Sequence, residues 1–245
     1  MENGSGLLTV SRIDKTKLSG RGLKREVLTL LQSEKFHRSL EELCQLPGRR
    51  VINPLFSFLL NREEQTRWRA ITAMGAVVAN LAEKDMESAR VVMRRLMWSL
   101  NDESGGIGWG APEAMGEIIA SHEGLAKEYV SVLISYVRED GNFLEYEALQ
   151  RGAIWGVGRV AQARPELVQK AVPHLVLFLE SPDAAVRGLA AWTLGLLVAE
   201  AARPQLEVLL GDETEITLYM DDRLIVRSVG ALAGEALAGI TGTRN

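Results

Sequence analysis

The chain is poor in cysteine and in long apolar runs. Its 245 residues include a single cysteine, Cys44, which excludes an internal disulfide and is typical of proteins from a reducing compartment. The longest uncharged stretches, 70–82 and 188–199, hold thirteen and twelve residues, fewer than the ~20 that a membrane-spanning helix needs. The N-terminus shows no apolar signal-peptide core. We therefore predict a cytoplasmic protein with no membrane partner.

The chain also lacks a large excess of charge of either sign. Its 28 lysines and arginines stand against 32 acidic residues, for a net charge of −4. This charge balance excludes a strongly basic nucleic-acid-binding protein, so nucleic acid is not the expected partner. The first 25 residues have a net charge of +4, which leaves −8 on the remainder. We expect residues 1–22 to form a flexible basic arm on an acidic domain, residues 23–245.

Groups that support catalysis or metal binding are scarce. The three histidines, His37, His122 and His174, are scattered and show no metal-ligand spacing. The sequence contains no GxxxxGK[ST] phosphate loop. Spacing alone identifies no nucleophile with its base. We predict no catalytic residue, no metal site and no cofactor, and favour a non-catalytic role while leaving enzyme activity open.

A repeat runs through the chain. Glycines that end apolar helical runs are separated by 41, 42, 37 and 39 residues, and they are Gly75, Gly116, Gly158, Gly195 and Gly234. A small residue stands five positions before each glycine, and an apolar residue stands directly before it. Small residues at this spacing allow two helices to approach closely, and the apolar neighbours supply a buried stripe. The period indicates five stacked helix pairs.

The unit 172–200 shows the pattern most completely. Ser181-Pro182-Asp183 is its predicted turn, and Val186-Arg187 opens its second helix. The unit resembles a HEAT repeat, of the HEAT-like kind found in phycobilin lyase subunits, and the resemblance extends over residues 51–239. It implies an all-α fold, a right-handed α-solenoid of about five HEAT-like helix pairs with an N-terminal helical cap. The expected parts are a cap at 23–50 and repeats at about 51–85, 86–124, 125–164, 165–200 and 201–240.

Three units carry long loops where the 172–200 unit has a short turn. These loops span 101–110, 139–147 and 211–223. In the last, two apolar segments flank Asp221-Asp222 and predict a small β-hairpin. Equivalent turns of stacked units lie along one edge, so we predict an acidic loop rim of Asp102, Glu103, Asp140, Glu145, Glu147, Asp221 and Asp222. Solenoids also tolerate such insertions without using them.

The predicted second helices share a mixed aromatic and charged face. Positions seven and three before each repeat glycine, together with the position after it, lie on one side of a helix. In HEAT repeats that side lines the concave surface, which predicts a binding groove of Trp68, Trp109, Glu113, Arg151, Trp155, Arg159, Trp192 and Arg227. The alternative is that the tryptophans fill gaps between repeats. Full burial of Trp155 and Trp192 between repeats would favour that alternative.

Three functions remain open at this stage. We favour a binding or scaffolding module that holds a protein partner in the groove and at the acidic rim. A tetrapyrrole-handling protein is the alternative that resemblance to phycobilin lyase subunits implies, because a small flat ligand stacks well on tryptophan. Resemblance to the HEAT-like glycosylases that excise alkylated bases from DNA implies a third. The acidic body argues against the third, because phosphate contacts dominate DNA affinity.

Overall fold

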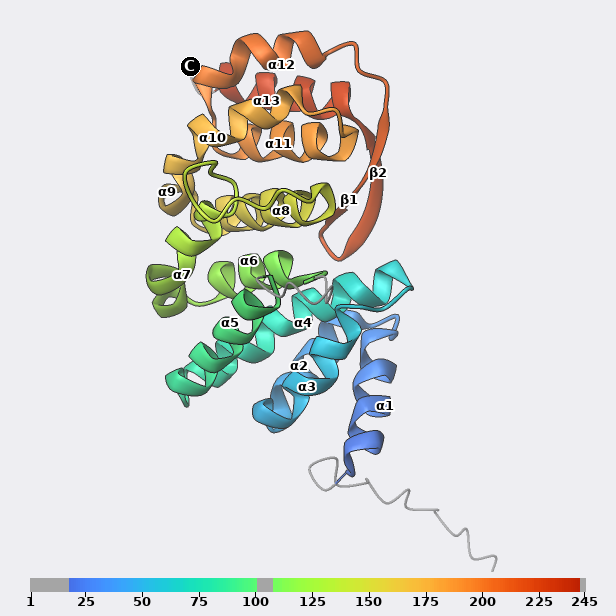
Figure 1. The fold of residues 1–245 in the computed structure, drawn as a ribbon. Helices are drawn as coiled ribbons and strands as arrows, with labels where there is room; N and C mark the ends of the chain where they lie inside the picture. The colour runs from blue at the N-terminus through green and yellow to red at the C-terminus, as the bar shows by residue number, and fades with distance from the viewer. Residues whose placement is uncertain (1–17, 101–107, 243–245) are drawn as a thin grey trace, which may run out of the picture.

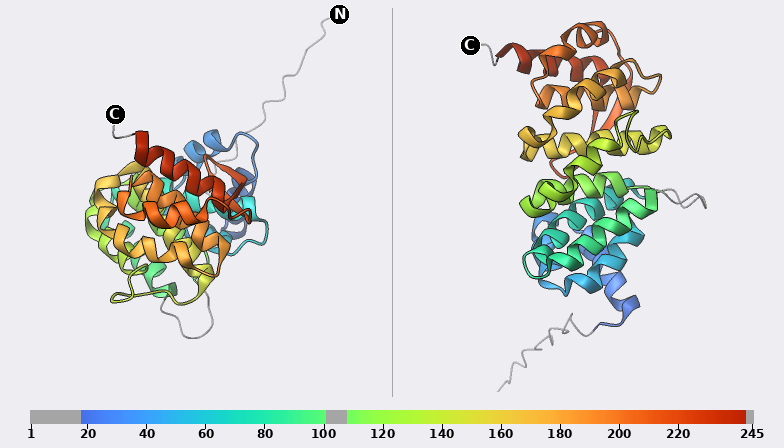
Figure 2. Two further views of the ribbon diagram at one scale, coloured as in Figure 1. Left: turned by 90° about the horizontal axis from the view of Figure 1, so that it is seen from above. Right: turned by 60° about the vertical axis from the view of Figure 1, so that its left-hand side comes forward.

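The computed structural model describes residues 18–100 and 108–242. Within them, the chain is a stack of antiparallel helix pairs, with α1 (Gly20–Leu31) and α13 (Val229–Gly242) at opposite ends of an elongated body (Figures 1 and 2). The Oγ atom of Ser19 accepts a hydrogen bond from the Gly22 backbone N–H at 3.2 Å and so caps α1. The first helix therefore begins inside the predicted arm of residues 1–22, of which residues 1–17 lie outside the described part.

The helices form an outer and an inner layer behind an N-terminal pair. The N-terminal pair is α1 and α2 (Phe36–Gln45). The outer helices are α3 (Gly48–Phe58), α5 (Met86–Leu100), α7 (Glu123–Ser135), α10 (Val172–Leu177) and α12 (Arg203–Leu209). The inner helices are α4 (Glu64–Ala82), α6 (Ala111–Ser121), α8 (Glu147–Ala163), α11 (Ala184–Leu196) and α13. Short α9 (Pro165–Val168) and 3₁₀ turns at 169–171, 178–180 and 200–202 complete the path.

Successive inner helices pack directly on one another, and glycines set their separation. A Cβ atom added at Gly116 on α6 would lie 2.4 Å from the Cα atom of Gly156 on α8. A Cβ atom at Gly158 would lie 2.2 Å from the ring of Trp192 on α11. Both distances are far below van der Waals contact, so these helices cross closely only because side chains are absent. The prediction that the repeat glycines allow close helix approach is confirmed at Gly75, Gly116, Gly158 and Gly195, but not at Gly234, where an added Cβ atom would be in ordinary contact at 3.7 Å.

The turn predicted at 181–183 forms as expected. The Asp183 carboxylate accepts a hydrogen bond from the Val186 backbone N–H at 2.9 Å and caps α11. Buried aliphatic side chains of α11 then pack on α8 and α13. A polar cap followed by an apolar stripe is a local sequence signal for a helix start, which explains why the repeat pattern is clearest in this unit.

The predicted β-hairpin is also present. Strands β1 (Glu215–Met220) and β2 (Arg223–Ser228) are antiparallel, with Leu218 opposite Ile225. Asp221 and Asp222 form the turn with φ angles of 50° and 61°, as a tight two-residue hairpin turn requires. From the C-terminal end, the hairpin passes α11 and α8 and reaches toward α4 (Figure 1).

This course corrects the predicted position of Asp221 and Asp222. They do not lie beside the 139–147 loop, which borders α10, because the hairpin tip contacts the N-terminal part of the stack. The Asp222 carboxylate lies 3.2 Å from Nε2 of His37, and its backbone oxygen accepts a hydrogen bond from Gln65 at 3.1 Å. Burial of apolar strand residues such as Leu218 against the inner helices directs the hairpin inward.

Two further properties of the described segments bear on function. No helix within residues 18–100 and 108–242 is both long and apolar enough to span a bilayer. In the same segments, histidine, cysteine and carboxylate side chains do not gather in groups of three or more that could hold a metal ion.

Candidate functional site

The hairpin borders several cavities on the inner surface of the stack, and two of them meet at Trp155 and Tyr219. We name the first, of about 450 Å³, the β1 pocket, because strand β1 forms one wall and the N-terminal parts of α4, α6, α8 and α11 form the others. The second, of about 730 Å³, is the hairpin-tip pocket, which lies between the hairpin turn and helices α2, α4, α6 and α8. Trp155 and Tyr219 line both cavities and form the partition between them.

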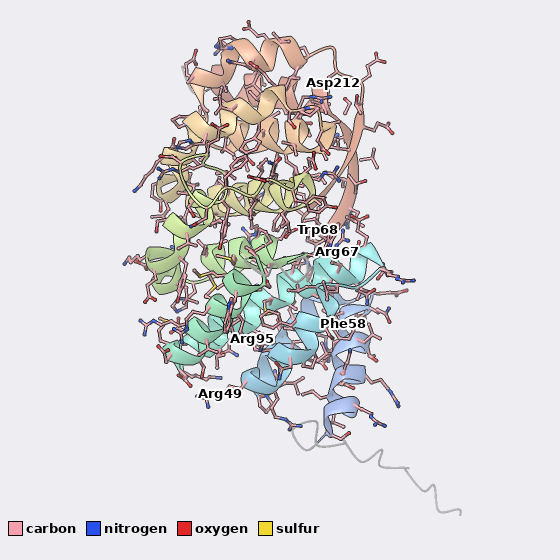
Figure 3. The ribbon with its side chains drawn as sticks, in the orientation of Figure 1. Arg49, Phe58, Arg67, Trp68, Arg95 and Asp212 are labelled. Atoms are coloured by element: carbon pink, nitrogen blue, oxygen red, sulfur yellow. The ribbon has the colours of Figure 1, made fainter. Side chains whose placement is uncertain are left out.

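An aromatic cluster holds the hairpin in place. The Trp68 ring stacks on the Tyr219 ring at 4.8 Å between centroids and contacts the Trp155 ring at 4.7 Å. Trp155 Nε1 donates a hydrogen bond to the Tyr219 backbone oxygen at 3.0 Å. The Tyr219 hydroxyl lies 3.2 Å from both Thr72 Oγ1 and Asp222 Oδ1. Trp68 and Arg67 lie on α4 beside the lower end of the hairpin (Figure 3).

Two of the predicted groove tryptophans are not on an open surface. Trp155 is 3% exposed and Trp192 is 8% exposed. Trp155 is covered by the hairpin, whereas Trp192 packs against Gly158 of the neighbouring inner helix. Their burial favours the alternative that these two tryptophans fill space between packed elements, although Trp155 also lines the β1 and hairpin-tip pockets and Trp192 lines a further cavity with Arg227.

Two other groove residues lie off the predicted helix face. Trp109 is in the turn before α6 and is 38% exposed, with its ring edge-on to Tyr146 at 6.2 Å. Gly110 follows it with a φ of 75°, a conformation that favours glycine, and this residue starts the helix later than the repeat pattern predicts. Arg227 lies on β2 and pairs with Glu235 at 3.6 Å.

Three charged groove residues face these cavities as well. Glu113 and Arg151 line the β1 pocket, and Arg159 lines the hairpin-tip pocket. Arg151 pairs with the Asp183 carboxylate across the mouth of the β1 pocket. Arg159 Nε lies 3.0 Å from Oε2 of Glu117, which is 5% exposed. Each guanidinium thus neutralises a carboxylate of an adjacent inner helix.

Glu113 differs from every other carboxylate of the β1 pocket. Its Oε2 atom is buried and has no hydrogen-bond partner. Burial raises the pKa of Glu113 to about 7, although its own backbone N–H and the charge of Arg67 act in the opposite direction. The nearest cations are engaged elsewhere: Arg67 pairs with Glu64 at 3.1 Å, and Arg151 pairs with Asp183. A buried acceptor without a partner is rare in folded proteins.

Part of the predicted acidic rim comes together in a third cavity. Asp140, Glu145 and Glu147 border a hollow of about 530 Å³ between the α7–α8 loop and α10, floored by Phe143 and Phe178. Asp140 pairs locally with Arg138 at 2.6 Å. Asp102 and Glu103 lie outside the described residues.

Sequence reasoning missed several residues of the β1 pocket. Tyr219 comes from the hairpin, and its place in the strand pattern was visible, but its long-range partners were not. Arg67 and Asp183 stand outside the repeat positions that were compared. The sequence does contain a signal for Asp183: it follows Ser181-Pro182 in the predicted turn before a helix, and residues at helix ends often line binding sites.

Comparison with known proteins agrees with this architecture. Residues 147–197, which span α8 to α11, match the family described as HEAT-like repeat. An uncharacterised protein of Archaeoglobus fulgidus is 32% identical over 126 residues, a match that covers 50% of this chain and 58% of that protein. The chain therefore spans little more than half the length of that relative.

Solved structures show the same fold. A designed armadillo repeat protein in complex with the peptide (KR)4 has a TM-score of 0.51 at 18% identity, covering 89% of this chain and 99% of that one. Kap121p bound to Nup53p has a TM-score of 0.53 at 16% identity, covering 90% of this chain and 25% of that one. The chain is thus an α-solenoid of the armadillo and HEAT type, and residues 147–197 form a HEAT-like repeat within it.

Proposed function

We propose that this protein is a binding module that holds a segment of a partner protein in the β1 pocket. The observation that carries the proposal is the pocket's composition: Trp68, Trp109 and Tyr219 surround a cavity that is also lined by Glu113, whose Oε2 atom has no hydrogen-bond partner. Aromatic side chains in a concave setting are typical anchors of protein interfaces. A partner segment lies along β1 in this proposal, because the hairpin closes the route across the full inner surface.

The fold and the charge support a protein ligand. Two structures with this fold were solved with protein or peptide ligands, a designed armadillo repeat protein with (KR)4 and Kap121p with Nup53p. The net charge of −8 beyond residue 25 favours basic segments over nucleic acid. The tetrapyrrole alternative loses support, because two of the tryptophans proposed to stack on a flat ligand, Trp155 and Trp192, are buried.

The test is affinity purification from a native extract with matched tryptophan variants. Trp109→Ala removes an exposed aromatic from the β1 pocket, whereas Trp98→Ala removes one that is 77% exposed on α5, outside the pocket. We expect the same protein to be retained by the wild type and Trp98→Ala and lost by Trp109→Ala. Equal retention by both variants would show that the β1 pocket is not the binding site.

A further inference from the structure

The geometry points to a specific ligand group. We propose that the β1 pocket receives a lysine or arginine side chain from a basic segment of the partner protein, and that its cationic group pairs with the Glu113 carboxylate. The inference rests on the proposed function and adds the chemistry by which the partner is recognised.

The first step concerns the position of Glu113. A Cβ atom added at Gly152 on α8 would lie 2.6 Å from Oε2 of Glu113, so this carboxylate occupies space that any other residue at 152 would fill. The carboxylate is thereby held in the pocket wall with one oxygen unpaired. An ionised carboxylate only accepts hydrogen bonds, so the group that completes it must be a donor.

The second step concerns the surrounding charges on each wall. Helix α4 contributes Arg67 and Glu64, which pair with each other. The guanidinium of Arg151 on α8 pairs with Asp183 before α11. Strand β1 adds the exposed carboxylate Glu215. Once the two ion pairs are set aside, the pocket keeps negative charge only, on Glu113 and Glu215, which favours a cationic ligand.

The aromatic residues favour the same class of ligand. The rings of Trp68, Trp155 and Tyr219 form one wall, in which the Trp155 indole N–H and the Tyr219 hydroxyl are already hydrogen-bonded. Trp109 adds a partly exposed ring at the mouth. Ammonium and guanidinium groups bind against aromatic rings, whereas anions are repelled by the ring faces.

Helix N-termini on the pocket wall do not turn it into an anion site. The start of α4 is capped by the Glu63 carboxylate, which accepts hydrogen bonds from two backbone N–H groups at 3.1 Å and 2.7 Å. The start of α11 is capped by Asp183. The starts of α6 and α8 have no side-chain cap, but their first turns carry Glu113 and Glu147. All four positive helix ends are therefore matched by carboxylates of the chain itself.

The pairing predicts a pH dependence with a definite sign. Burial places the pKa of Glu113 near 7, so about half of the carboxylate is protonated at neutral pH. The cation binds the ionised form, which means that binding releases a proton and weakens as the pH falls. Affinity should fall by up to about tenfold per pH unit below 7.

The experiment is calorimetric titration with an octapeptide of alternating lysine and arginine, from pH 6 to pH 8, in buffers of different ionisation enthalpy. An octapeptide of glutamine is the ligand control. Glu113→Gln keeps the shape of the side chain and removes its charge, whereas Gly152→Ala displaces the carboxylate and keeps its charge. Glu166→Gln, an exposed carboxylate on α9 outside the pocket, is the protein control.

We expect the wild type and Glu166→Gln to bind the basic peptide, release a proton and weaken toward pH 6. Glu113→Gln should bind at least about tenfold more weakly and lose the pH dependence, and Gly152→Ala should also bind more weakly. Wild-type affinity and pH profile in Glu113→Gln would overturn the inference. If Trp109→Ala loses the native partner while Glu113→Gln keeps it, the partner binds in the β1 pocket but no cation pairs with Glu113. If both variants keep the partner, the proposed function fails as well.

Discussion

Two carboxylates on one helix have opposite environments. Glu113 and Glu117 lie one turn apart on α6 and both face the inner surface. Opposite Glu117, helix α8 presents Arg159; opposite Glu113, two turns earlier, it presents Gly152. The same residue type on the same helix face thus becomes a closed ion pair in one cavity and an unpartnered acceptor in the other.

The difference indicates which cavity is structural and which is available to a ligand. In the hairpin-tip pocket, Glu117 is satisfied by a cation of the chain itself, so its burial needs no ligand. In the β1 pocket, the corresponding position on α8 is Gly152, which has no side chain to pair with Glu113. The Oε2 atom of Glu113 is therefore left for an external donor. The following four predictions test this contrast, beginning with the residue that separates the cavities.

Trp155→Ala should have the largest effect on stability. The Trp155 ring is buried among Trp68, Tyr219 and the hairpin and lines both cavities, so truncation leaves a void and frees the hairpin. We expect a loss of about 3–5 kcal/mol in the free energy of unfolding, measured by urea denaturation. Trp98→Ala, at an exposed site, should stay within about 0.5 kcal/mol of the wild type. A loss below about 1 kcal/mol for Trp155→Ala would mean that the partition is not a packed core.

Arg159→Met should rank second. It leaves Glu117, which is 5% exposed, as a buried carboxylate without its cation. We expect a loss of about 3 kcal/mol at pH 8. Arg151→Met is the matched control, because its ion pair with Asp183 is 47% exposed on the arginine side and should contribute less than about 1 kcal/mol. If both variants lose the same free energy of unfolding, the buried Arg159–Glu117 pair stabilises the fold no more than the exposed Arg151–Asp183 pair does.

The third prediction concerns the pH dependence of stability. Burial raises the pKa of Glu113 from 4.5 to about 7, so the folded state binds more protons than the unfolded state between these values. The free energy of unfolding should therefore fall as the pH rises from 5 to 8, by up to roughly 3 kcal/mol from this group. Glu113→Gln should lose that part of the slope, as thermal unfolding across the pH range would show. If the free energy of unfolding changes with pH in the same way in the wild type and in Glu113→Gln, ionising Glu113 does not destabilise the folded state.

The smallest effect is expected at the hairpin tip. Asp222→Asn keeps a residue that tolerates the positive φ of 61° and removes the charge that faces His37, whose side chain is 87% exposed. The Asp222 side chain is 19% exposed and also lies 3.2 Å from the Tyr219 hydroxyl, a contact that the side-chain oxygen of asparagine can keep. Because a charge that faces an exposed partner contributes little, the free energy of unfolding should change by less than about 1 kcal/mol. A larger loss in urea denaturation would mean that the tip, rather than the aromatic cluster, holds the hairpin.

Much of the fold could be predicted from local pattern. The repeat glycines marked the inner helices, the Ser181-Pro182-Asp183 turn marked a helix boundary, and two apolar segments around Asp221-Asp222 marked the hairpin. Each of these signals depends on residues close together in the chain, where helical and strand periods are read directly. The candidate site was harder to predict from the sequence than the fold. Of the eight predicted groove residues, five line the β1 pocket, namely Trp68, Trp109, Glu113, Arg151 and Trp155.

The sequence by itself determined the repeat, the close helix spacing and the acidic character of the body, because these follow from periodicity and composition. Only the tertiary structure decided that the last repeat sends its hairpin back to α4, burying Trp155 and placing Asp222 beside His37. It also decided that α8 offers Arg159 to one carboxylate of α6 and Gly152 to the other. Such pairings depend on the rotation and offset of one helix against the next, which the spacing within either helix does not contain.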